Sequence, residues 1–160
     1  MARRQVLMKV TWVAALTGFL ALAPGGFASA QGGSTIADIA AYTGPDRIEK
    51  LIAGAKKEGT VTLYTSANVD DMAVVTSAFE KKYGVKVRVW RGSSENVVQR
   101  GVAEARGNRF DADVFETGGA AMESLHREKL LQEVKSPNLT DLDPAAVRAH
   151  GEWTGTRAKI

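Results

Sequence analysis

The chain contains no cysteine and only two histidines among its 160 residues. The lack of cysteine excludes a disulfide framework, thiolate metal sites and a lipid-anchored cysteine. The histidines, His126 and His150, stand in separate segments without a metal-ligand spacing, so neither a metal site nor a cofactor is predicted. The sequence also lacks a nucleophile elbow, a Walker motif and a dinucleotide-binding fingerprint. It therefore does not indicate an enzyme.

Acidic residues are absent before Asp38, where the charged residues are Arg3, Arg4 and Lys9. The whole chain has 21 Lys and Arg against 18 Asp and Glu, so removing these three basic residues leaves 18 of each sign. The remainder is neutral, and a nucleic-acid partner is not expected. Its length and its 44% hydrophobic content are those of a single globular domain.

The first thirty residues have the layout of a cleaved signal peptide. Basic residues precede the uncharged stretch Val10–Ala23, Pro24-Gly25-Gly26 then breaks a helix, and Ala28-Ser29-Ala30 offers the small residues that a signal peptidase reads. The uncharged stretch is shorter than the ~20 residues of a membrane-spanning helix. We expect cleavage after Ala30 and a periplasmic protein that is not membrane-embedded; Sec and twin-arginine export both remain open.

Helical and extended patterns alternate along the rest of the chain. The sequence predicts strands over 60–65, 85–90 and 112–117, with helices over 46–58, 68–83 and the segments that follow positions 94 and 119. Strands separated by helices indicate a parallel sheet. The predicted fold class is α/β, a three-layer sandwich with a mainly parallel sheet. A short helix is expected over 145–150 and a strand over 151–160.

Apolar residues at helical spacing give the faces expected to be buried. They are Met72, Val75, Phe79 and Tyr83 in the second long helix, Val98, Val102 and Ala105 in the next, and Met122 and Leu125 in the last.

Ligands of open α/β sheets bind beyond the carboxyl ends of the strands. Three loops there are small and rich in hydroxyl groups or glycine, and each leads into a helix whose free N–H groups suit a polar or anionic group. The predicted ligand-binding residues are Thr65, Ser66, Ala67, Arg91, Gly92, Ser93, Ser94, Glu116, Thr117 and Gly118. An alternative is that Asn68 and Ser93 or Ser94 only cap helices, while Gly118 and Gly119 only turn the chain.

The charges beside these loops do not agree on one ligand. Arg91 suits a carboxylate or phosphate, whereas Asp70, Asp71 and Glu116 would repel one if they faced the site. Trp90 and Trp153 are candidates for stacking on a ligand or for packing in the core.

A series of short segments between Leu51 and Pro137 has a specific order and spacing. They are AKKEG at 55–59, VTLYTS at 61–66, FEKKYG at 79–84, GSS at 92–94, ADVFET at 112–117 and LL at 130–131. This run resembles the first lobe of the periplasmic solute-binding proteins of ABC importers, in the type 2 group that includes ferric-iron binders. Trp153–Arg157 resembles the segment that starts crossing into a second lobe.

The resemblance implies a two-lobed, hinge-closing receptor that delivers its ligand to a membrane permease, with the second lobe missing from this sequence. It divides the chain into a signal peptide (1–30), a lead-in (31–45), a solute-binding lobe (46–150) and the start of a hinge or crossover strand (151–160). Ferric binders place a histidine in the first loop, where positions 65–71 have none, and a glutamate where this chain has Gly118. A small polar or anionic solute, or a metal ion, is the implied ligand.

Two other readings remain. An exported enzyme with a flavodoxin-like α/β core would need a catalytic dyad. A signalling receiver domain would need clustered acids facing a lysine, and it would not be exported.

Overall fold

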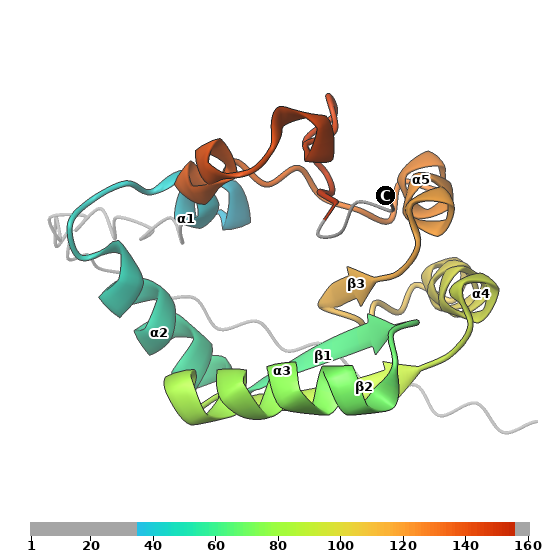
Figure 1. Ribbon diagram of the computed structural model, residues 1–160, viewed down its shortest axis with the longest axis horizontal. Helices are drawn as coiled ribbons and strands as arrows, with labels where there is room; N and C mark the ends of the chain where they lie inside the picture. Colours follow the sequence, from blue (N-terminus) through green and yellow to red (C-terminus); the bar gives the residue numbers. More distant parts are fainter. Residues whose placement is uncertain (1–34, 156–160) are drawn as a thin grey trace, which may run out of the picture. The chain divides into compact units, whose positions relative to one another are not determined.

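A computed structural model describes residues 35–155 of the chain. Its sheet has three parallel strands, β1 (Thr60–Thr65), β2 (Lys86–Arg91) and β3 (Val114–Glu116), in the order β2-β1-β3 (Figure 1). Helices connect the strands, so the predicted α/β class and the parallel sheet are confirmed. The predicted signal peptide lies outside the described residues, as does the end of the predicted final strand.

Five α-helices and two short 3₁₀ helices are described in this part of the chain. They are α1 (Ile36–Ala41), α2 (Arg47–Glu58), α3 (Val69–Tyr83), α4 (Ser94–Arg106), α5 (Gly119–Arg127), η1 (Pro137–Asp141) and η2 (Pro144–Ala146). Gly59 and Gly84 end α2 and α3 in the left-handed conformation, with φ of 78° and 69°, which glycine adopts without steric cost. The sequence therefore located these two helix ends correctly.

The third strand is shorter than predicted, because a side chain replaces the backbone at its start. The backbone N–H of Thr62 donates to Asp113 Oδ2 at 2.7 Å, so a carboxylate takes the place of a strand carbonyl. The regular ladder with β1 consequently begins at Val114. The predicted strand over 112–117 is thus confirmed only for 114–116.

The C-terminal elements also differ from the prediction. The helix expected over 145–150 is the single 3₁₀ turn Pro144–Ala146. Within the described residues the expected strand from 151 is reduced to an isolated antiparallel bridge between Val147 and Thr154. Gly151 has a φ of 68°, which is incompatible with extended backbone and explains why no strand starts there.

The core lies between the sheet and α4 and α5. Tyr64 of β1 is 1% exposed, and Val97 of α4 and Leu125 of α5 are fully buried. Phe115 of β3 meets Tyr64 edge-on, with ring centroids 5.8 Å apart. The predicted burial of Met122 and Leu125 is confirmed.

The buried face of α4 differs from the predicted one. Val97, Gly101 and Glu104 are buried, whereas Val98, Val102 and Ala105, one position further along, are only half-buried. The spacing of apolar residues predicted the wrong face because a glycine and a glutamate occupy two of the three buried positions. Gly101 packs closely there, since an added Cβ would lie 3.2 Å from Phe115 Cζ.

The predicted apolar stripe of α3 is not buried in the described part of the chain. Val75 is 60% exposed and Phe79 is 37% exposed, while Met72 and Tyr83 are half-buried. α3 contacts β2, but its outer apolar residues have no cover among the described elements. None of the described helices combines the length and apolar character needed to cross a bilayer.

Candidate functional site

The three predicted loops start at one edge of the sheet. Thr65 pairs in register with Arg91 on one side and with Glu116 on the other, so the carboxyl ends of all three strands are level. The Ser66 N–H donates to the Glu116 carbonyl at 3.0 Å, and the Gly92 N–H donates to the Thr65 carbonyl at 3.1 Å. The expectation that the three loops meet at one edge is confirmed in this geometry.

Thr65 connects the first and third loops. Its side chain is fully buried, and Oγ1 donates to Glu116 Oε2 at 2.5 Å while accepting a hydrogen bond from the Ala67 N–H at 2.9 Å. Glu116 is therefore engaged in holding the loops together. The contact orients one carboxylate oxygen of Glu116 toward Thr65 at the end of β1.

Arg91 holds the first loop from the other side. Its Nε donates to the Ala67 carbonyl at 2.7 Å, although the residue as a whole is exposed. One nitrogen of the guanidinium is thus held on the first loop. Arg91 is positioned by the fold and is still accessible.

The helix starts partly follow the capping alternative. Asn68 Oδ1 accepts from the Asp70 N–H at 2.8 Å, and Ser93 Oγ accepts from the Asn96 N–H at 3.2 Å, so both residues are N-caps. Gly118 at the start of α5 provides no side-chain cap, and the first turn of α5 has no acidic residue. The positive end of the α5 dipole at this edge is therefore not offset by a capping side chain or by an acidic residue in the first turn of the helix.

The second and third loops face each other across this edge. Ser94 Oγ lies 3.6 Å from the point where a Cβ on Gly118 would stand, so a larger residue at 118 would contact the serine. The Thr117 hydroxyl is buried and has no hydrogen-bond partner among the described residues. An unpaired buried hydroxyl is costly and suits a ligand atom that would complete its hydrogen bond.

Trp153 approaches the same edge from the C-terminal segment. Its Cη2 lies 3.6 Å from a Cβ built on Gly119, and its indole N–H is buried without a partner among the described residues. Arg148 stacks on the indole ring at 5.1 Å from the centroid. Trp153 is half-buried and packs beside Gly119 and Arg148, which agrees with the packing role that the sequence left open.

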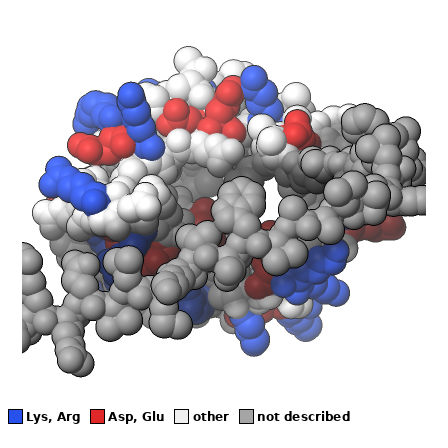
Figure 2. Space-filling view, turned by 180° about the vertical axis from the view of Figure 1, so that it is seen from behind, with Lys and Arg blue, Asp and Glu red and all other residues white. Residues whose placement is uncertain are grey.

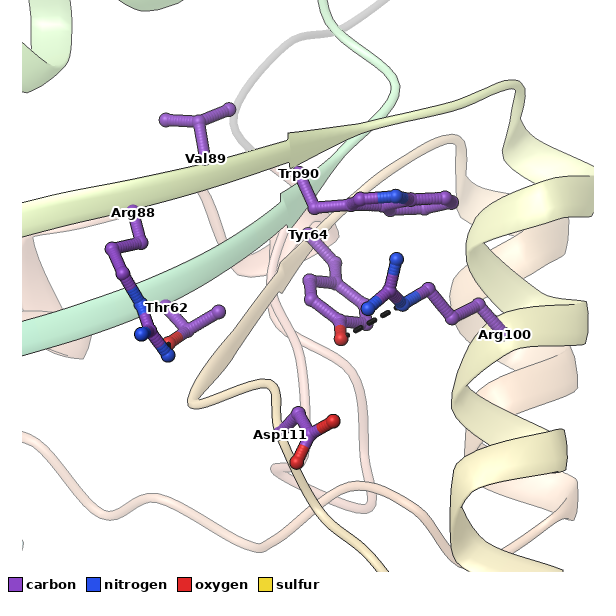
Figure 3. Close-up of a pocket in the computed structure, with 7 residues that line it drawn as sticks. All are labelled: Thr62, Tyr64, Arg88, Val89, Trp90, Arg100 and Asp111. Carbon is purple, nitrogen blue, oxygen red and sulfur yellow. Dashed lines mark hydrogen bonds between the residues drawn. The ribbon is translucent and has the colours of Figure 1, made fainter.

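A hollow of about 350 Å³ lies elsewhere, on the sheet face beneath α4 (Figure 3). The guanidinium of Arg100 lies over the rings of both Tyr64 and Trp90, 4.7 Å and 4.6 Å from their centroids, which are themselves 5.1 Å apart (Figure 3). The other residues lining the hollow are Thr62, Arg88, Val89 and Asp111. The sequence predicted no site at this hollow. Trp90 was a candidate either for stacking on a ligand or for packing in the core, and in the structure its ring stacks on the guanidinium of Arg100.

Glu104 balances Arg100 within the core. Tyr64 Oη donates to Glu104 Oε1 at 2.7 Å, and Arg100 Nε donates to the same oxygen at 2.7 Å. Burial by itself raises the pKa of the Glu104 carboxyl, but these two hydrogen bonds and the Arg100 charge bring that pKa below its ordinary value. Burial is also the main cause that raises the pKa of Tyr64. The trio is a satisfied polar element of the core.

The structure brings together two histidines that the sequence left apart. His126 of α5 and His150 stack with ring centroids 3.9 Å apart, and Glu152 lies beside His126. A spacing of 24 positions with an intervening loop gives no metal-ligand pattern in the sequence. The cluster arises because the segment after η2 folds back along α5.

Known protein structures that resemble the chain are iron-binding proteins. The Trichodesmium protein IdiA (FutA), in complex with iron and citrate, matches with a TM-score of 0.54 and 26% identity over 61% of this chain and 31% of its own. Iron-bound HitA from Pseudomonas aeruginosa matches with a TM-score of 0.56 and 26% identity, over 60% of this chain and 31% of its own. The ferric binding protein from Campylobacter jejuni matches with a TM-score of 0.52 and 22% identity, over 57% of this chain and 29% of its own. At this low identity the match bears on the fold alone.

The chain spans about 31% of the length of the first two of these proteins. No protein-family model matches the chain. No curated protein matches it either. The three similar structures are named for binding iron and none is named as an enzyme, in agreement with the prediction that the chain is not an enzyme. The described residues thus form a single lobe of the type 2 periplasmic-binding-protein kind, and the predicted resemblance to its ferric-iron-binding group is confirmed.

Proposed function

We propose that the chain is the first lobe of the solute-binding component of an ABC importer. In this proposal it captures a small anionic solute, free or as a metal chelate, and presents it to a membrane permease. The observation that carries the proposal is the convergence of the ends of β1, β2 and β3, with their three loops, on one edge of the sheet. This is where open α/β sheets bind ligands.

The anionic character of the ligand rests on the start of α5. Backbone N–H groups at a helix N-terminus attract negative charge, and α5 has neither a capping side chain nor an acidic residue in its first turn. By contrast, Asp70 and Asp71 lie in the first turn of α3, and Glu95 lies in that of α4. An anionic group therefore fits best beside Gly118, within reach of Ser94 and the unpaired Thr117 hydroxyl.

A carboxylate-bearing iron chelate meets both the geometry and the comparisons. The similar Trichodesmium structure holds iron together with citrate. In this chain the first loop offers no histidine, and Gly118 offers no carboxylate, so the two iron ligands that the resemblance places at these positions are absent. Citrate would supply the carboxylates for iron itself and leave its outer oxygens for N–H and hydroxyl donors of the protein.

The location follows from the first thirty residues. We propose that they are a signal peptide cleaved after Ala30, which would direct the lobe to the periplasm, where an importer needs its binding component. Acidic and basic side chains are interspersed on the face shown in Figure 2, as suits a freely diffusing carrier of small solutes. A second lobe would close over the ligand from the opposite side.

Calorimetric titration with citrate, ferric citrate and phosphate tests the proposal. We expect saturable binding of citrate or its ferric complex, weak because one lobe encloses only one side of the ligand. Gly118→Asp places a carboxylate at the start of α5 and is expected to abolish this binding. Gly54→Asp, on the open surface of α2, is the matched control that adds the same charge elsewhere. Equal binding by all three proteins would contradict the proposal.

A further inference from the structure

Three side chains of types that bind metal ions lie together where α5 meets the segment after η2, away from the proposed solute site. His126, His150 and Glu152 each offer one ligand atom, and these atoms all lie within 4.8 Å of one another. All three residues are half-buried. His126 lies near the C-terminal end of α5, roughly 10 Å along the helix from Gly119 at a rise of 1.5 Å per residue.

The hydrogen bonds of the cluster indicate which nitrogen and oxygen atoms it offers to a metal ion. The Glu152 N–H donates to His150 Nδ1 at 3.2 Å, so that nitrogen carries a lone pair. His150 Nε2 is buried and has no hydrogen-bond partner among the described residues, since Glu123 Oε1 stands 3.7 Å away. His126 Nδ1 and Glu152 Oε2 share one hydrogen bond of 2.7 Å. Imidazole nitrogens and a carboxylate oxygen are the ligands that zinc and similar ions take.

The charge around the cluster is negative. Glu123 and Glu152 provide two carboxylates, against which Arg148 provides one guanidinium, 3.2 Å from Glu123. Arg127 of the same helix turns to Ser124, whose hydroxyl its guanidinium contacts at 3.1 Å. A divalent cation would therefore be attracted to this point of the surface.

We infer that His126, His150 and Glu152 bind a divalent transition-metal ion of the zinc class, with water completing the coordination. The ion takes the place of the hydrogen bond between His126 Nδ1 and Glu152 Oε2, and the imidazole keeps its one proton on Nε2. The ion joins α5 to the segment that follows η2, so it acts as a clamp on this part of the fold. The inference does not depend on the proposed solute function, because none of its ligands belongs to the three loops.

Metal binding requires a small rearrangement of the rings. The two imidazole planes are inclined by only 13°, so the nitrogen lone pairs lie in two nearly parallel planes 3.9 Å apart at the ring centroids and do not meet at one point. Tetrahedral zinc with ligand bonds near 2.0–2.1 Å needs ligand atoms about 3.4 Å apart. The rings must therefore rotate toward a common point, which would end their stacking. This change gives the inference a spectroscopic signature of its own.

Titration of the purified chain with zinc chloride at pH 7.5 tests the inference. We expect saturable binding of one zinc ion per chain, measured by calorimetry. His126→Gln, His150→Gln and Glu152→Gln are each expected to weaken binding at least about tenfold. Glu128→Gln, an exposed carboxylate just beyond α5, is the matched control and should bind as the unmodified chain does.

The histidine signals make the test independent of the variants. Because the chain has two histidines, its NMR spectrum has two sets of imidazole resonances, and zinc should shift both. Cobalt(II) in place of zinc should give the visible absorption of a four-coordinate site. Absence of saturable zinc binding, imidazole signals that do not move, or binding retained in all three variants would overturn the inference.

Discussion

Thr65 Oγ1 donates a hydrogen bond to Glu116 Oε2 across 2.5 Å, joining the ends of two parallel strands whose residues are 51 positions apart. Because Thr65 is fully buried, no water replaces this bond when it is lost. Thr65→Val removes the hydroxyl while keeping the shape of the side chain. It removes the acceptor of the Ala67 N–H and the hydroxyl that donates to Glu116 Oε2. We expect a loss of about 1–3 kcal/mol in the free energy of unfolding, measured by urea denaturation.

Thr60→Val is the control for this substitution, since Thr60 is an exposed threonine on the same strand. Its effect should stay within about 0.5 kcal/mol. Similar effects at both positions would mean that the hydroxyl of Thr65 does not hold the loops together.

Gly101 and Gly54 are both helical glycines with opposite surroundings. An added Cβ at Gly101 meets Phe115 and Leu125 at 3.2–3.5 Å, whereas at Gly54 it meets nothing within 4 Å. Gly101→Val should therefore cost about 1–3 kcal/mol through overpacking. Gly54→Ala should raise the free energy of unfolding by about 0.5–1 kcal/mol through better helix propensity. Thermal unfolding of both variants checks this; a stabilising Gly101→Val would contradict the packing of α4 on β3.

The buried Glu104 predicts an acid limb in the stability profile. Its pKa in the folded protein lies below the ordinary glutamate value of about 4.3 because Tyr64 and Arg100 hydrogen-bond the carboxylate strongly enough to outweigh burial. The stabilisation is therefore complete above that ordinary value and is lost as the pH falls through the folded pKa. We expect the difference in unfolding free energy between the chain and Glu104→Gln to shrink from pH 7 to pH 3.

Glu58→Gln, at the exposed end of α2, serves as the control for the pH profile. Its difference from the unmodified chain should be small at every pH. A Glu104→Gln difference that stays constant down to pH 3 would show that folding does not lower the pKa of Glu104.

Arg91 and Ser93 are predicted to contribute to solute binding in different ways. Arg91→Ala removes the positive charge and the hydrogen bond to the Ala67 carbonyl, so it should reduce the thermal stabilisation given by a bound anion. Ser93→Ala removes the N-cap of α4, which costs about 0.5–2 kcal/mol of stability, and should weaken binding less. Thermal-shift measurements with and without citrate separate the two effects. Unchanged stabilisation in both variants would exclude them from the site.

The local signals in the sequence were sufficient to locate the sheet and its loops. β1 has the predicted bounds because Thr60–Thr65 is a run of β-branched and aromatic residues between Gly59 and a polar turn. The helices between the strands predicted parallel pairing, and parallel strands have their carboxyl ends at the same edge of the sheet. The convergence of Thr65, Arg91 and Glu116 was therefore predictable without knowledge of any side-chain contact.

Contacts between distant segments were not predictable from pattern. The buried face of α4 contains Gly101 and Glu104, which no hydrophobic count selects, because their burial depends on Phe115 and Tyr64 in other strands. The histidine cluster likewise depends on how the chain after η2 returns to α5. The short bounds of β3 depend on Asp113, whose side chain binds the backbone of β1.

The central claim is that the three strand-end loops form one binding edge, and amide NMR during a ferric citrate titration tests it most directly. Paramagnetic iron broadens the resonances of nearby nuclei, and the method detects even weak binding by a single lobe. We predict that the amide signals of Ser66, Ser94 and Gly118 broaden together, ahead of those in α2. Broadening confined to other surfaces, or none in these three loops, would contradict the account.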